Sequence, residues 1–542
     1  MTKKTFVKGA VILGAAGIFV KIMGFIFRIP LVNMIDSRAM AYYNPAYYVY
    51  VFFVTLATSG IPVAVSRMVS ERVTLNNYED ADRVFKLSMR LMLGIGIVSF
   101  VIVFGGADII AGLMDNPGAA LPMRFVSPCL IIIPVLAAFR GLFQGMQNMR
   151  PTALSQIVEQ LFRVAFGLAL AYILFNSADT VLGGETKYVK GASGAVFGGT
   201  AGAIGGLAMI FIIYMVNRKS FKRKIREGNP RSSESNGSVY KEILVISIPI
   251  TVGASIMPLI NMIDAGLIVG RLKSTGMSTV MAEELYGGLT GMVNSMINFP
   301  QVIALAVATS MVPLIAAAYK EKDYAFAEKN IQLSIRFSML IGMPCAVGFF
   351  VLAKPILLTL FPTQAGVIEY VSPAFMIMAV AVIFLGFVQT LTGVLQGVGK
   401  QMIPVRNMFV GVGAKLLCTW FLVPIPALGI KGAAIGTILA YMIASVLDVM
   451  AVIKYTNVHI NWVSCVGRPL AAAAAMGVCV FVIYKILMLL TASVTFSTLA
   501  SILLGAIIYA IMAIISKAVT RDELESMPKG HLILKIFGRF IK

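Results

Sequence analysis

Long apolar runs alternate with short polar breaks along almost the whole chain. About 14 of the runs are long enough to cross a bilayer, for which roughly 20 residues suffice. We expect every run to be a helix, because a spanning segment must satisfy its own backbone polar groups. The expected spans are 7–35, 45–69, 84–104, 122–146, 152–175, 190–216, 243–270, 285–318, 331–352, 367–396, 404–426, 430–453, 466–490 and 496–516. The pattern predicts an all-α polytopic membrane protein.

Composition agrees with the pattern. The chain has 542 residues, of which 58% are hydrophobic and 13% are charged. The formal charge of +21 would suit a nucleic-acid partner, but the basic residues lie at the ends of the apolar runs rather than in one patch. This is the positive-inside pattern, and it predicts that both termini are cytoplasmic and that no nucleic acid is bound. The five cysteines lack paired spacing, so we expect neither disulfides nor a metal site.

The two halves of the chain resemble each other. Four short motifs recur in the same order: NMID at 33–36 and 261–264, LSMR at 87–90 and LSIR at 333–336, VSP at 126–128 and 371–373, and GLFQG at 141–145 and GVLQG at 393–397. Six spans in each half preserve orientation, so the repeats are parallel. Such repeats are typical of transporters that bind their substrate between the halves.

The repeat predicts the domain organisation. We expect an N-terminal lobe at 1–216, a flexible basic linker on the cytoplasmic side at 217–242, and a second lobe at 243–454. The last two spans, within 455–517, lie outside the repeat. The tail at 518–542 mixes basic and bulky apolar residues, which predicts a short amphipathic helix in the membrane interface.

Two cations lie inside the first span. Lys21 and Arg28 are seven residues apart, so both lie on one face of the helix. Lys21 would be roughly 20 Å deep, where a charge needs a partner, a wet cavity or an anionic ligand. Arg28 could instead extend to the headgroups, and Lys21 could form a buried ion pair. The functional alternative is a cationic wall that receives a negative substrate.

Further polar groups lie in other spans. Glu159 and Arg163 are four residues apart and can pair; Lys415 falls at a similar depth in the second half. A polar stripe on one face of the eighth span either bonds a neighbouring helix or lines a cavity; its members are Asn294, Asn298 and Gln301. Asp264 and Asp448 are candidate ion or proton sites, and Asp264 is favoured.

Two other features each leave two interpretations open. Five tyrosines gather between positions 42 and 50, where they form either an interfacial aromatic belt or a surface for stacking on sugars. Several prolines lie within spans, where each removes a backbone hydrogen bond and kinks its helix. A kink is either static or a place where the span bends during transport.

The run RGLFQG at 140–145, with PTA at 151–153 and SQIVEQ at 155–160, resembles the stage V sporulation protein B family. That family includes the MurJ-type lipid II flippases of the Firmicutes. KIMG at 21–24 and SGIPVAVS at 59–66 fit the same family. It belongs to the multidrug/oligosaccharidyl-lipid/polysaccharide exporter (MOP) superfamily. The resemblance implies a V-shaped pair of six-helix lobes around a cationic cavity, with the last two spans forming a groove for a lipid tail.

The resemblance also bears on single residues. Relatives carry a basic residue, usually Arg, at the position of Lys21. Some relatives bind sodium through an acid on span seven and Asn or Asp on span eleven, to which Asp264 and Asn407 would correspond. In the Gram-negative MurJ branch a basic residue precedes the Phe-Pro of span eight, and none precedes Phe299 here. That residue cannot be carried over.

These observations predict a flippase in a bacterial cytoplasmic membrane rather than an enzyme. Its substrate would be an undecaprenyl-pyrophosphate-linked saccharide, with lipid II favoured and a capsule or spore-cortex unit as the alternative. An ion-coupled small-molecule exporter ranks lower. We expect a monomer in membrane lipid, with no cofactor beyond sodium or a proton as coupling ion. The expected substrate-binding residues are Lys21, Arg28, Arg163, Lys415, Asn294, Asn298 and Gln301, and the expected ion-coupling residues are Asp264, Asn407 and Glu159.

Overall fold

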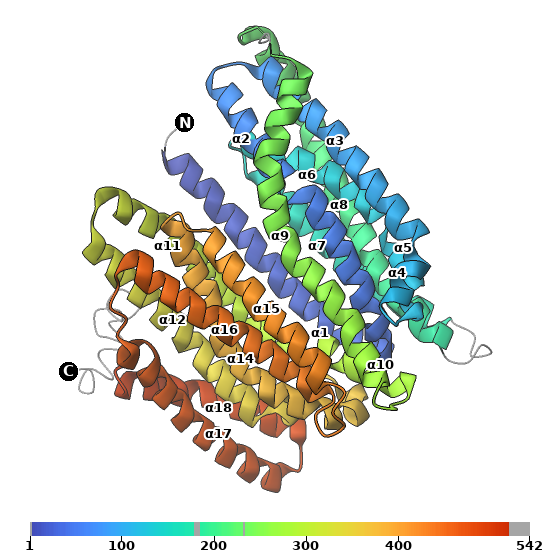
Figure 1. The fold of residues 1–542 in the computed structure, drawn as a ribbon, viewed down its shortest axis with the longest axis vertical. Helices are drawn as coiled ribbons and strands as arrows, with labels where there is room; N and C mark the ends of the chain where they lie inside the picture. Colours follow the sequence, from blue (N-terminus) through green and yellow to red (C-terminus); the bar gives the residue numbers. More distant parts are fainter. Residues whose placement is uncertain (1–2, 178–184, 231–233, 520–542) are drawn as a thin grey trace. The chain divides into compact units, whose positions relative to one another are not determined.

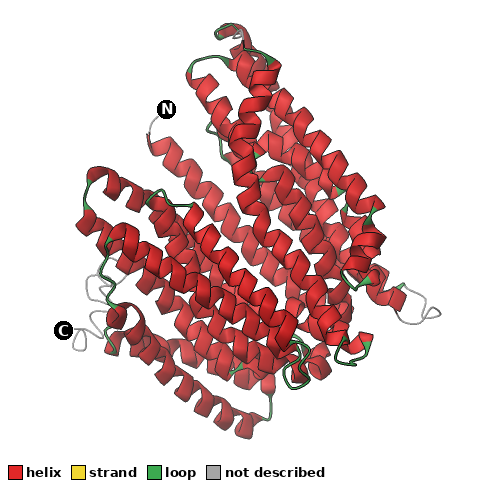
Figure 2. Cartoon of the chain, in the orientation of Figure 1, coloured by secondary structure: helices red, strands yellow, loops and turns green. Residues whose placement is uncertain are grey.

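A computed structural model describes residues 3–177, 185–230 and 234–519, and in these ranges every regular element is a helix (Figure 2). By length and composition, 11 of the described helices could cross a membrane, or up to 12 if one bent pair counts as a single span. This confirms an all-α polytopic membrane protein. The expected count of about 14 is higher for two visible reasons. Residues Ile12–Thr74 count once, and the 21-residue helix α15 (Met402–Leu422) is not among the candidates.

The described helices form two compact units. The first unit comprises Met1–Lys273 and Ser278–Gly287. Its helices are α1 (Lys3–Thr58), α2 (Ile61–Thr74), α3 (Tyr78–Gly105), α4 (Ala107–Leu113), α5 (Ala120–Val126), α6 (Cys129–Gly145), α7 (Arg150–Asn176), α8 (Glu185–Glu227), α9 (Asn236–Lys273) and most of α10 (Thr279–Gly288).

The first helix of this unit is a hairpin rather than one rod. Arg28 donates a hydrogen bond of 2.9 Å to the side chain of Asn44, 16 residues later. Along a straight helix these residues would be about 24 Å apart. The backbone leaves the helical region at Asp36, where φ is 75° and ψ is 159°, so α1 runs away from the N-terminus and returns towards α2 (Figure 1). The expected span 7–35 is the first arm, and the expected span 45–69 covers the end of the second arm and continues past a break into α2.

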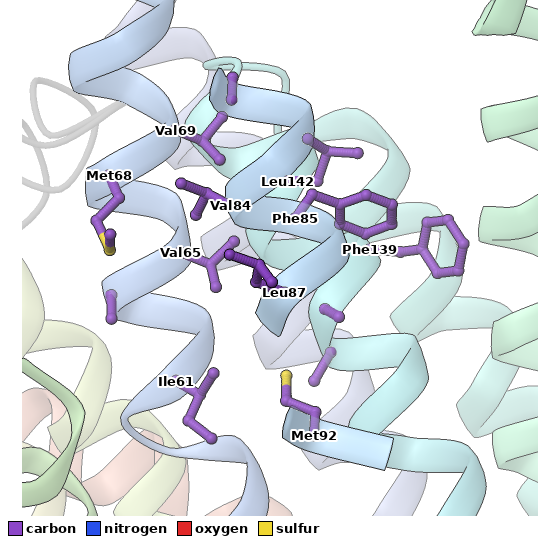
Figure 3. Packing of buried hydrophobic residues seen from close by; sticks show 14 of the residues in the cluster. Ile61, Val65, Met68, Val69, Val84, Phe85, Leu87, Met92, Phe139 and Leu142 are labelled. Carbon is purple, nitrogen blue, oxygen red and sulfur yellow. The ribbon is translucent and has the colours of Figure 1, made fainter. Parts of the chain in front are cut away.

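The apolar core of the first unit explains why α9 belongs to it. Buried side chains of α2, α3 and α6 pack together, among them Val65, Phe85 and Phe139 (Figure 3). Val239 and Ile243 of α9 are buried in the same cluster. The sequence placed 243–270 at the start of the second lobe. The structure differs because the apolar face of α9 is covered by helices of the first half.

The second unit comprises Ser274–Met277 and Gly288–Lys542. Its described helices are α11 (Asn294–Glu321), α12 (Tyr324–Val351), α13 (Ala353–Leu360), α14 (Ala365–Gly397), α15, α16 (Ile430–Thr456), α17 (Arg468–Thr491) and α18 (Val494–Ile515). Their core gathers buried side chains from α11, α12, α14, α16 and α17. The short π-helical turns Leu289–Val293 and Val463–Gly467 precede α11 and α17.

The linker and tail predictions have different outcomes. Residues 217–227 continue helix α8, and α9 begins at Asn236, so most of the described linker is helical rather than flexible coil. Arg223 and Glu227 are four residues apart and form an ion pair, which favours continued helix. The tail falls almost wholly outside the described residues, and its helix stays a prediction.

At two prolines of the first unit, the freed backbone carbonyl meets a residue from elsewhere in the unit. Pro45 cannot bond the carbonyl of Ala41, and the buried Asn116 side chain donates to that oxygen instead, at 2.7 Å. At Pro134 of α6 the carbonyl of Leu130 is freed, and Gly96 of α3 packs against it. At both prolines the carbonyl that the kink frees has a contact from outside its own helix.

Candidate functional site

Arg28 lies in an aromatic pocket of the first unit. Its guanidinium is 4.9 Å from the ring centroid of Tyr43 and 6.0 Å from that of Tyr47. These two rings are stacked 5.9 Å apart, and the Asn44 side chain accepts the one hydrogen bond that Arg28 makes among the described residues. A guanidinium has five N–H donors, so most of its donors stay open to an anion. The Arg28 side chain therefore does not extend to the headgroups.

The tyrosine cluster differs from the expected interfacial belt, and stacking on sugars stays a prediction. Tyr42, Tyr43 and Tyr50 are buried, and only Tyr47 and Tyr48 are partly exposed. Cation–π contact and stacking hold the rings around Arg28 inside the unit. An interfacial belt would expose its rings at the membrane surface, so that interpretation is wrong for most of the cluster.

A second cationic group lies on α6 and α7. Glu159 accepts from Arg163 at 3.0 Å, which confirms the expected pair, and also from Arg140 at 2.9 Å. Arg140 further donates to the buried hydroxyl of Ser155 at 2.9 Å. One carboxylate thus serves two guanidinium groups, and the Nε of Arg163 is buried without a hydrogen-bond partner. The group keeps one net positive charge.

Helix contacts bring the two cationic groups into one region. Gly24 of α1 lies against the side chain of Gln160 on α7, four residues before Arg28 on the one helix and three residues before Arg163 on the other. Lys21 is exposed and makes no ion pair among the described residues, because Glu159 is occupied by Arg140 and Arg163. The buried-pair interpretation of Lys21 is therefore wrong. Four cations therefore share this region of the first unit, and two of them pair with Glu159.

The first unit also holds a buried acidic group that the sequence did not single out. Glu283 of α10 accepts from Arg38 at 3.2 Å and from the phenol of Tyr42 at 2.8 Å. The guanidinium of Arg38 is also 5.1 Å from the ring centroid of Tyr188. This network fixes α10 to the bend of α1, directly before the chain passes into the second unit at Gly288. Asp264 is half-buried on α9 of the same unit.

The remaining predicted residues belong to the second unit. Asn294 and Gln301 are partly buried on α11 and Asn298 is exposed; Lys415 is partly buried on α15. Gln301 lines a small cavity together with Ser338 and Gly386. Asn407 is buried and donates to Asp448 at 2.8 Å, so its observed partner is Asp448 rather than Asp264.

Arg140 and the Asn407–Asp448 pair show what the sequence analysis missed. Arg140 is 19 residues from Glu159 and on another helix, so helical spacing could not link them. The RGLFQG motif contains Arg140 and was the available signal. Asn407 and Asp448 are 41 residues apart, and both face the helix contact between α15 and α16.

Comparison with known proteins finds matches over most of the chain. The pattern of the polysaccharide biosynthesis protein family matches residues 6–319, and that of the MatE family matches residues 249–421. Lipid II flippase MurJ of Bacillus subtilis (strain 168) is 26% identical over 499 residues, covering 89% of this chain and 88% of that protein. Stage V sporulation protein B of the same organism is 25% identical over 541 residues, covering 99% of this chain and 100% of that protein.

Solved structures share the fold. A structure described as lipid II flippase MurJ in an inward closed conformation has a TM-score of 0.66 at 13% identity, covering 93% of this chain and 98% of that one. An inward-facing multidrug resistance MATE family transporter of the MOP superfamily has a TM-score of 0.67 at 17% identity, covering 81% of this chain and 94% of that one.

Together these findings define a multi-pass membrane transporter of the MOP superfamily and not an enzyme. The chain belongs to the polysaccharide biosynthesis protein family.

Proposed function

We propose that this transporter is a flippase that moves an undecaprenyl-pyrophosphate-linked saccharide across the membrane, with lipid II as the favoured substrate. One observation carries the proposal: the membrane helices of the first unit hold Lys21, Arg28, Arg140 and Arg163, and within the described residues the only acid that pairs with any of them is Glu159. Uncompensated cations inside a membrane span are costly unless an anion or water meets them. A pyrophosphate carries the charge that this region lacks.

The residues have distinct roles in this proposal. Arg28 offers its open N–H donors to the phosphate oxygens while Tyr43 and Asn44 fix its orientation. Lys21 supplies a point charge on the same helix face, without the bidentate geometry of arginine. Arg163 belongs to the group that it forms with Arg140 and Glu159, and this group adds one net positive charge. Lys415, Asn294, Asn298 and Gln301 are proposed to contribute from the second unit.

The saccharide is the least determined part of the proposal. The identities to the lipid II flippase and to the stage V sporulation protein are nearly equal, at 26% and 25%. A capsule or spore-cortex unit linked to the same lipid pyrophosphate would meet the same cations. A test of the proposal must therefore measure the transport of lipid II itself.

The test uses bacterial cells depleted of their own lipid II flippase and dependent on this chain. We expect the unaltered chain to restore growth and lipid II exposure on the outer leaflet. Lys21→Ala and Arg28→Ala should reduce exposure at least tenfold, whereas Lys219→Ala, at an exposed position of α8, should not. Full rescue by Lys21→Ala would remove Lys21 from the mechanism. Failure of the unaltered, membrane-inserted chain would argue against lipid II as substrate.

A further inference from the structure

The second unit encloses one acid that the proposed substrate region does not use. Asp448 of α16 is completely buried, and its Oδ1 accepts a hydrogen bond of 2.8 Å from Nδ2 of Asn407 on α15. Its other oxygen, Oδ2, is equally enclosed and has no hydrogen-bond partner. Within the described residues, Asp448 makes no other hydrogen bond and no ion pair. One of the two oxygens of this carboxyl group therefore accepts a hydrogen bond and the other does not.

Close packing of α15 and α16 explains the enclosure. A Cβ at Gly411 would lie 2.3 Å from the carbonyl oxygen of Ala440, so the two backbones touch one turn beyond Asn407. Gly436 packs in the same way against Lys415. Helices this close leave no room for water between them. An ionised Asp448 would therefore have neither solvent nor a counter-charge, and burial of such an ion is strongly unfavourable.

The charged residues of α14 and α15, the helices that pack against α16, do not supply a counter-charge for an ionised Asp448. On α15, Arg406 is exposed beside Asn407, and Lys415 lies eight residues beyond it, about 12 Å along the helix. On α14 the charged residue is Glu369, which pairs with Lys354 near the opposite end of the helix.

The charged groups of α16 itself are also too far away. Lys431 is in the first turn of α16, and Lys454 is six residues after Asp448, with its ammonium 5.8 Å from the ring centroid of Tyr455. The other titratable side chains on these helices are phenols and one thiol, which supply no positive charge: Tyr370, Cys418, Tyr441 and Tyr455.

We propose that Asp448 and Asn407 form a proton-binding site, and that Asp448 carries a proton when α15 and α16 are packed as they are here. A bound proton makes the carboxyl group neutral, which removes the penalty of burial. A metal cation fits less well, because it needs several oxygen ligands and the Asn407 amide directs its N–H donors at the carboxylate. The proton is released to water when the two helices separate, and no other bond changes.

The coupling of this proton to transport rests on the proposed function, whereas the site itself does not. If α15 and α16 separate during the transport cycle, Asp448 alternates between a buried protonated state and a hydrated ionised state. The proton gradient would then favour one direction of the cycle. Proton uptake by the Asp448 carboxylate would be the energy-coupling step.

Infrared difference spectroscopy of the full-length protein in lipid nanodiscs tests the site directly. At neutral pH we expect Asp448→Asn to remove one protonated-carboxyl band, and Asn407→Ala to shift that band. Glu369→Gln is the control, because its exposed carboxylate should leave the band unchanged. A spectrum in which Asp448→Asn removes an ionised-carboxylate band would overturn the proposal. So would loss of the protonated band when sodium is added, because it would indicate a cation site.

Liposome assays then test the coupling. If unaltered protein flips an undecaprenyl-pyrophosphate lipid, an imposed pH gradient should stimulate it several-fold, and Asp448→Asn should abolish the stimulation while substrate binding is retained. Full stimulation in that variant would refute coupling through Asp448. Absence of flipping by the unaltered protein would refute the proposed function and leave the infrared result to decide the site.

Discussion

The phenol of Tyr509 in α18 donates a hydrogen bond of 2.8 Å to the backbone carbonyl of Leu340 in α12. Pro344 lies four residues after Leu340 and has no N–H, so it leaves that carbonyl without its helical partner. The side chain of one of the last two helices therefore completes the backbone of a helix in the second half of the repeat. This gives α18 a structural task in addition to the lipid-tail groove that the family resemblance implies.

Tyr509→Phe should destabilise the protein by about 1–3 kcal/mol, because a buried carbonyl loses its donor. A thermal unfolding assay in detergent measures the effect. Tyr484→Phe, on α17, is the matched control, since no hydrogen bond of that phenol is found among the described residues. In a Pro344→Ala background the loss should largely disappear, because alanine at this position restores the backbone donor. An equal loss in both backgrounds would refute this account.

Asn116 should matter for the same reason at the other end of the chain. Asn116→Ala is expected to lower stability by about 1–3 kcal/mol, because the Ala41 carbonyl freed by Pro45 loses its 2.7 Å bond. The same unfolding assay applies, with Asn176→Ala, at the exposed end of α7, as the control. Pro45→Ala should reduce the effect. A loss that is independent of residue 45 would point to another role for Asn116.

The Arg38–Glu283 pair should be sensitive to removal of either charge. The two side chains are only 10% and 6% exposed, so Glu283→Gln removes the carboxylate with which this buried guanidinium pairs. Removing one partner of a buried pair typically reduces stability by about 3–5 kcal/mol. A large drop in melting temperature is expected, compared with little change for Glu71→Gln in the exposed Arg67–Glu71 pair. Equal effects of the two substitutions would contradict a buried pair.

Glu159 should be required for folding rather than for binding the lipid. Glu159→Gln leaves Arg140 and Arg163 without their shared carboxylate, and we expect lower stability and less protein in the membrane. Arg163→Gln removes one cation and leaves the Arg140–Glu159 pair intact, so it should retain more protein while weakening lipid transport. Quantitative blotting of membranes and the leaflet assay together separate the two variants. Normal abundance of Glu159→Gln would contradict this assignment.

Gly287 lies where α10 packs against the bend of α1. A Cβ there would be 1.8 Å from the carbonyl oxygen of Ser37, so Gly287→Ala cannot be accommodated without moving backbone. We expect loss of folded protein, measured by size-exclusion chromatography after mild solubilisation. Gly276→Ala would isolate a different effect, because that glycine has open space but a φ of +83° that disfavours a side chain. Normal folding of Gly287→Ala would contradict the close approach.

The sequence by itself determined the helical class, the approximate helix limits and the cations inside the first span. These properties depend on local apolar pattern and on residue type. Expected spans such as 152–175 and 496–516 agree closely with α7 and α18. The i, i+4 pair of Glu159 and Arg163 was predictable for the same reason, since helical spacing alone brings the two side chains together.

Only the tertiary structure decided which distant residues meet. The assignment of α9 to the first unit, the addition of Arg140 to the Glu159 pair and the contact of Asn407 with Asp448 all depend on which helix faces touch. Most of these helices are apolar over much of their circumference, so a one-dimensional pattern does not say which face meets which neighbour. Close packing selects the partners, because only certain faces bring small residues and complementary polar groups into register.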